Sequence, residues 1–141
     1  MNIHESAEDY LESILMLKEA KGYARSVDIA LKLGVTKPSV SVAMKHLREN
    51  GYITVDDDNL ISLTEKGDQI ASRIYDRHRT LTRYLVKLGV QEDVARADAC
   101  KMEHDLSEET YQAMKNALNE VLHGKLGKGY KKGCKKSTDD F

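Results

Sequence analysis

Tryptophan is absent from this 141-residue chain, which also contains only one proline and two cysteines. The absence of tryptophan argues against an aromatic binding platform, and the single proline argues against a proline-rich linker. Cys100 and Cys134 are too few and too far apart for a disulfide framework or for a CxxC zinc site. We therefore expect a protein of the reducing cytoplasm.

Long apolar runs are also missing. No run approaches the roughly 20 residues that are needed to cross a bilayer, and the first residues, MNIHESAEDY, lack the basic and apolar regions of a signal peptide. We expect neither secretion nor a membrane partner. A composition of 40% hydrophobic and 32% charged residues indicates one or two small globular domains.

The chain has no large excess of positive charge, since its formal net charge is −1. This balance argues against a general polyanion binder, but the charge is unevenly distributed. Residues 22–50 carry five basic and two acidic side chains, a local excess of +3, and residues 124–136 add six lysines without an acid. Two local basic zones are compatible with DNA binding.

The order of elements expected over residues 1–64 is that of a winged helix-turn-helix domain. Apolar residues at intervals of three and four predict helices, and β-prone segments around the turn DDDN predict a hairpin. Ser26, Thr36 and Thr64 are predicted helix N-caps. The predicted elements are helices at 6–21, 26–33 and from Thr36 to Asn50, and strands at 52–55 and 60–63.

Residues 65–123 are predicted to form an all-helical domain, so the fold class is mainly α. Helices are expected at 65–88, at 91–105 and after a Ser107 cap. The apolar residues of the first two exceed what one small domain can cover, which predicts dimerisation. The glycine-broken, lysine-rich segment 124–141 is expected to be disordered.

The second helix of the helix-turn-helix is predicted to read DNA. Small hydroxyls can meet base edges, lysine and arginine can pair with phosphates, and Pro38 and Val42 can touch thymine methyls. An ordinary helical hairpin with solvated lysines is the alternative. The acidic tip at 56–58 would repel phosphate, so we expect it to be a solvated turn. The predicted DNA-binding residues are Arg25, Thr36, Lys37, Pro38, Ser39, Ser41, Val42, Lys45 and Arg48.

Six scattered residues combine carboxylate, imidazole and thiolate groups, which suit a first-row transition ion. Asp9 and Glu12 are three apart, and Cys100, Glu103 and His104 follow an i, i+3, i+4 pattern, so each group would share a helix face. His78 interrupts an apolar stripe. Taken singly, Asp9 and Glu12 also fit a solvated acidic face, and His78 also fits a core histidine. The pattern of Cys100, Glu103 and His104 can also occur by chance.

Five segments together resemble the diphtheria-toxin-repressor family of metal-dependent regulators, including its manganese-transport-regulator branch. They are EDYLESIL at 8–15, KGYARSVDIALKLGVTKPSVS at 21–41, LTEKG at 63–67, RH at 77–78 and ACKMEHDLS at 99–107. The resemblance implies a winged helix that binds a palindromic operator, a helical homodimerisation and metal-binding domain, and Fe(II) or Mn(II) as corepressor. It implies the two-domain form without an SH3-like domain. The implied ligands are Asp9, Glu12, His78, Cys100, Glu103 and His104.

Two departures from the family pattern bear on the metal. The manganese branch has glutamate where this chain has Cys100, and the iron-sensing branch usually has methionine where this chain has Asp9. Because thiolate favours Fe(II) over Mn(II), we expect Fe(II) first, Mn(II) next, and Zn(II) or Co(II) in vitro. The predicted function is a transcriptional repressor of metal-homeostasis genes. A winged-helix regulator that senses a small molecule is the alternative; an enzyme is disfavoured because no separate general base or phosphate loop is evident.

Overall fold

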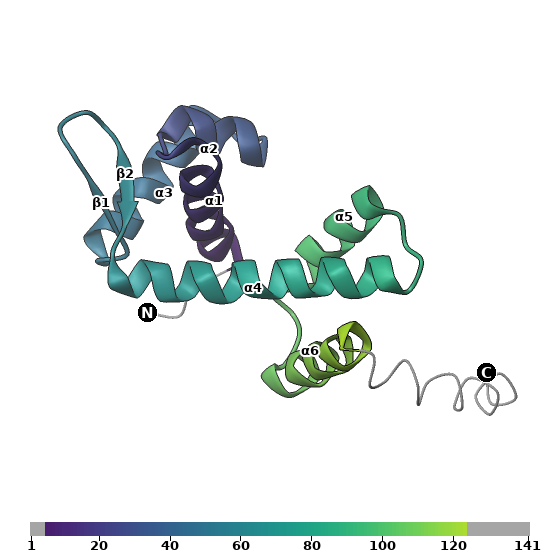
Figure 1. Cartoon of the computed structure of the whole chain (residues 1–141). Coiled ribbons are helices and arrows are strands. Elements are labelled where there is room, and N and C mark those ends of the chain that lie inside the picture. Colours follow the sequence, from purple (N-terminus) through teal and green to yellow (C-terminus); the bar gives the residue numbers. More distant parts are fainter. Residues whose placement is uncertain (1–4, 124–141) are drawn as a thin grey trace, which may run out of the picture. The chain divides into compact units, whose positions relative to one another are not determined.

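The computed structural model describes residues 5–123, which form six α-helices and one two-stranded antiparallel sheet (Figure 1). The elements are α1 (Glu5–Lys21), α2 (Ser26–Leu33), α3 (Lys37–Glu49), β1 (Ile53–Val55), β2 (Ile61–Leu63), α4 (Glu65–Lys87), α5 (Glu92–Met102) and α6 (Glu108–Leu122). The mainly α class and the winged helix-turn-helix followed by helices are confirmed. The predicted disorder of 124–141 lies outside the described residues. Among those residues, no helix is both long and apolar enough to cross a membrane.

The chain divides into two compact units, Met1–Asp76 and Arg77–Phe141, and this division falls inside α4. The first turns of α4 belong to the first unit because Ala71 is completely buried in its core. Gly67 is also buried, and an added Cβ there would lie 2.0 Å from the carbonyl oxygen of Tyr52. A helix start this close to β1 cannot be separated from the winged-helix domain.

The core of the first unit brings α1, α2, α3 and the hairpin together. Completely buried apolar side chains from the three helices pack there with the inward-facing residues of the strands. Antiparallel pairing aligns Ile53 with Leu63 and Val55 with Ile61. The N–H of Ile61 donates to the carbonyl of Ala24 at 2.9 Å, which ties the segment before α2 to the hairpin. The core residues with no exposure include Leu11, Ile14, Ile29 and Val40.

Three predicted helix starts have the expected side-chain caps. Backbone N–H groups donate to the hydroxyls of Thr36 at 3.3 Å, Thr64 at 3.2 Å and Ser107 at 3.2 Å. These bonds satisfy amide donors that have no partner within the first helical turn.

The prediction that Ser26 caps α2 is wrong, because Ser26 is already the first helical residue. Arg25 occupies the N-cap position, and its side chain makes no capping bond. Its carbonyl accepts from the N–H groups of Asp28 and Ile29. Both strands are one residue shorter at their start than predicted.

The turn of the hairpin is organised by one of its own carboxylates. The Oδ1 atom of Asp56 accepts from the N–H groups of Asp58 and Leu60, both at 2.9 Å. Asn59 adopts a left-handed conformation with φ of 61°, which asparagine tolerates better than most residues. The acidic tip is exposed, as predicted, and it is a defined turn.

Candidate metal site and DNA-binding surface

Three predicted ligands of the second unit converge in space. One atom each from His78, Cys100 and Glu103 can be chosen so that all three lie within 4.8 Å of one another. His78 comes from α4, Cys100 from α5, and Glu103 follows α5 directly. The Nδ1 atom of His78 lies 2.9 Å from Oε2 of Glu103. An imidazole, a thiol and a carboxylate are therefore within the span of a single coordination sphere.

Glu103 is the centre of this cluster and is completely buried. Its Oε1 atom has no hydrogen-bond partner among the described residues, although Nε2 of His104 lies 3.4 Å away. A buried carboxylate is costly unless it is paired or coordinates a metal. The donor set of Glu103, His78, His104 and Cys100 therefore fits a first-row transition ion.

The local backbone explains how these ligands meet. Glu103 keeps a right-handed helical conformation, and its N–H still donates to the carbonyl of Ala99, so it remains one turn from Cys100. His104 lies in the turn that follows. The prediction of a helix as far as residue 105 is wrong, because α5 ends at Met102 and His104 lies beyond its end.

Asp9 and Glu12 belong to the first unit. They lie three residues apart on α1 and therefore share a helix face, as predicted. Glu12 is only 6% exposed and Asp9 is half-buried. The hydroxyl of Ser13 donates to the main-chain carbonyl of Asp9 at 2.8 Å. The alternative interpretation placed both acids on a fully solvated helix face, and the low exposure of both side chains argues against it.

The exposed face of α3 carries the predicted DNA-binding residues. Val40, Met44 and Leu47 are buried on one side of the helix, which leaves the other side exposed. The hydroxyls of Thr36 and Ser39 lie 2.8 Å apart, so each already has one hydrogen-bond partner. The exposed predicted residues are Thr36, Lys37, Pro38, Ser39, Ser41, Val42, Lys45 and Arg48, and Arg25 is exposed before α2.

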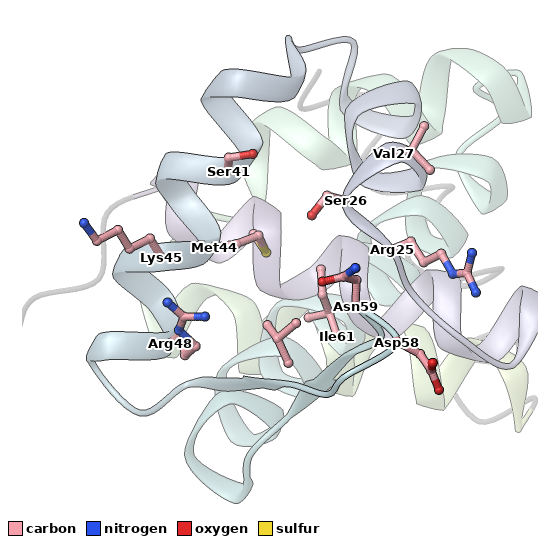
Figure 2. A pocket seen from close by; sticks show the side chains of 11 residues that line it. Arg25, Ser26, Val27, Ser41, Met44, Lys45, Arg48, Asp58, Asn59 and Ile61 are labelled. Atoms are coloured by element: carbon pink, nitrogen blue, oxygen red, sulfur yellow. The ribbon is translucent and has the colours of Figure 1, made fainter.

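A hollow of about 480 Å³ lies beside this face, between α3, the start of α2 and the hairpin (Figure 2). Arg25 is on one side of the hollow, and Lys45 and Arg48 are on the other. Ser26 and Asn59 also line it, and sequence reasoning missed both. In the sequence Ser26 is marked only by its position beside a basic residue, and Asn59 only by its position in a turn. Neither position indicates a shared hollow, because three separate segments form it.

A winged helix-turn-helix joined to a helical unit with transition-metal donors defines a metal-dependent DNA-binding regulator. Two family models cover most of the chain. The iron-dependent repressor N-terminal DNA-binding domain matches residues 2–59, and the iron-dependent repressor metal-binding and dimerisation domain matches residues 64–127. The chain belongs to the iron-dependent repressor family, which confirms the resemblance to diphtheria-toxin-repressor proteins. It is a transcriptional regulator and not an enzyme.

Individual relatives agree with this assignment. The transcriptional regulator MntR of Escherichia coli O6:H1 is 39% identical over 79% of this chain and 72% of its own length. The crystal structure of T. acidophilum IdeR has a TM-score of 0.74 and 30% identity, over 84% of this chain and 55% of that one. A manganese-dependent transcriptional repressor in complex with manganese has a TM-score of 0.72 and 28% identity, over 80% and 52%. This chain thus spans about half the length of these two solved structures.

Proposed function

We propose that this chain is a cytoplasmic repressor of metal-homeostasis genes, and that a divalent ion held by six residues controls its affinity for DNA. The observation that carries the proposal is the convergence of His78, Cys100 and Glu103 within 4.8 Å in the metal-binding and dimerisation region of the chain. The proposed ligands are those three residues with His104, Asp9 and Glu12.

The donor set supports Fe(II) as the first choice. A thiolate favours Fe(II), Co(II) or Zn(II) over Mn(II), whereas carboxylates keep a harder ion acceptable. Cys100 is exposed and lies beside the imidazole of His78 and the carboxylate of Glu103. Mn(II) is the second choice, since a relative's structure contains manganese. Zn(II) and Co(II) are expected to bind in vitro.

The ligands themselves explain how metal binding becomes regulation. Asp9, Glu12 and Glu103 are acids with low exposure, and bringing their negative charges together is unfavourable. When bound, the ion supplies the positive charge that reverses this repulsion. In the proposed site the acids of α1 and the donors of the second unit bind the same ion. This shared ion restricts movement between the two units. The DNA-binding domain loses conformations that cannot bind an operator.

A homodimer supplies the second DNA-binding domain. The second unit exposes several large apolar side chains, and surfaces of this kind commonly become covered on association. Two recognition helices held about 34–36 Å apart would reach successive major grooves of a palindromic operator. The exposed apolar residues are Val86, Leu88, Val94, Val121 and Leu122.

The test begins with DNA sites selected from a random pool in the presence of Fe(II) or Mn(II). Binding of the selected DNA is then measured anaerobically against each buffered ion and against chelator. Wild-type protein should release the DNA when chelator is added. Glu12→Ala and His104→Ala should remove this metal response while leaving a folded dimer.

Two matched variants control for the loss of charge and of imidazole. Glu19→Ala changes an exposed acid on the same helix, and His123→Ala changes an exposed histidine after α6. Both should respond to metal as the wild type does. A full metal response in Glu12→Ala or His104→Ala would contradict the shared site. A wild type that ignores chelator would favour the regulator that senses a small molecule.

A further inference from the structure

Arg77 is an arginine with little exposure that no part of the proposed function uses. It directly precedes His78 on α4, and its side chain is only 8% exposed. Burial of a guanidinium is unfavourable unless its donors are satisfied. Its contacts therefore indicate which part of the chain it organises.

The guanidinium of Arg77 donates hydrogen bonds to the connection between α5 and α6 and to the first residue of α6. Nη1 donates to the carbonyl of Glu103 at 3.2 Å and to the carbonyl of Leu106 at 2.8 Å. Nη2 donates to Oε2 of Glu108 at 2.6 Å. One side chain thus holds three points of a six-residue segment, and this segment contains Glu103 and His104.

The ring of Tyr111 supports the same guanidinium from another direction. The Cζ atom of Arg77 lies 4.9 Å from the ring centroid, and the Tyr111 hydroxyl donates to Oγ1 of Thr80 at 3.3 Å. Thr80 and Tyr111 are both buried. The first turn of α6 is therefore connected to α4 by an ion pair, a cation–π contact and a hydrogen bond.

We propose that Arg77 is a positioning residue of the metal site. Its guanidinium holds the backbone that carries Glu103 and His104. The side chains of these two residues are therefore oriented toward the imidazole of His78 before the metal binds. Groups that orient metal ligands in this way typically contribute about 10–100-fold to metal affinity. This inference rests on the proposed metal site.

Glu108 is the safest place to test the proposal, because its side chain is 63% exposed and its removal leaves no large cavity. Glu108→Gln removes the charge that Nη2 contacts, and Glu109→Gln is the matched control. Glu109 is the next residue in the same first turn and is also exposed, so its charge also lies near the helix terminus. Arg77→Lys keeps the positive charge but cannot reach three acceptors in the same geometry.

The experiment measures the affinity of each variant for Co(II) by competition with a chromophoric chelator, together with the melting temperature with and without Co(II). Glu108→Gln should weaken Co(II) binding about tenfold and Arg77→Lys by about 10–100-fold. Glu109→Gln should bind as the wild type does. The increase in melting temperature on adding Co(II) should shrink in the first two variants.

Each other outcome has a distinct meaning. If Glu108→Gln and Arg77→Lys melt at lower temperature but bind Co(II) as tightly as the wild type, Arg77 only stabilises the fold and the inference is wrong. Equal losses in Glu108→Gln and Glu109→Gln would also overturn it, because general charge would then explain the effect. A wild type that binds no Co(II) would instead contradict the proposed metal site.

Discussion

The Nδ1 atom of His78 lies 2.9 Å from Oε2 of Glu103, although 25 residues separate them along the chain. Glu103 is completely buried, so bulk water cannot solvate its carboxylate. The imidazole of His78 is therefore a polar neighbour that this carboxylate acquires only when the chain folds. An ion bound by both groups would satisfy the carboxylate as it neutralises its charge.

The first prediction concerns the carboxylate itself. Glu103→Gln keeps the size of the side chain but removes its charge, so metal affinity should fall at least about tenfold while the protein remains folded. Direct titration with Co(II) or anaerobic Fe(II) measures the loss. Asp98→Asn, a change of the same kind on α5, should have little effect. Unchanged metal affinity in Glu103→Gln would remove this residue from the site.

The second prediction concerns metal selectivity. Cys100→Glu replaces a soft thiolate with a hard carboxylate, so the ratio of Fe(II) to Mn(II) affinity should fall. The measurement is metal-dependent DNA binding under anaerobic conditions with each buffered ion. Cys134→Ser, the same loss of a thiol at the only other cysteine, should leave the ratio unchanged. If Cys100→Glu leaves it unchanged too, the thiolate does not set selectivity.

The third prediction separates affinity from sequence recognition on α3. Lys45→Ala should weaken binding to all DNA sequences and reduce the slope of log affinity against log salt by about 1, as expected for one lost phosphate contact. Ser41→Ala should leave that slope unchanged and alter the preferred bases. Lys18→Ala, an exposed lysine on α1, is the control for net charge. A wild-type slope in Lys45→Ala would exclude a phosphate contact.

The fourth prediction tests the packing of α4 against the hairpin. Replacing glycine with alanine inside a helix normally stabilises the helix by about 1 kcal/mol. At Gly67, however, the new Cβ would lie 2.0 Å from the main-chain oxygen of Tyr52. Gly67→Ala should therefore lower the free energy of unfolding by about 1–3 kcal/mol in urea titrations. Ser72→Ala, at an exposed position of α4, should be neutral or slightly stabilising, and a stabilised Gly67→Ala would contradict the contact.

Local signals predicted most of the fold from the sequence. The Thr36 cap and the buried Val40, Met44 and Leu47 of α3 are separated by intervals within one helix, so periodicity and capping chemistry locate them. Ser26 was wrongly predicted as a cap because Arg25 holds that position by its backbone carbonyl alone. A sequence pattern contains no signal for such a bond.

Long-range contacts could not be predicted in the same way. The spacing of Cys100 and Glu103 indicated a shared face, but nothing local showed that Arg77 would hold the carbonyl of Leu106. The hollow was missed for the same reason, since Asn59 joins its wall only after the hairpin folds beside α3. Likewise, the division inside α4 depends on the burial of Ala71 in the first unit.

In the proposed mechanism metal binding and DNA binding are coupled, and thermodynamic linkage makes this coupling measurable from either side. The most direct measurement is the anaerobic Fe(II) affinity of the wild-type protein with and without its selected DNA. Fe(II) should bind more tightly in the presence of DNA, by the same factor by which Fe(II) tightens DNA binding. Equal Fe(II) affinity with and without DNA would contradict it.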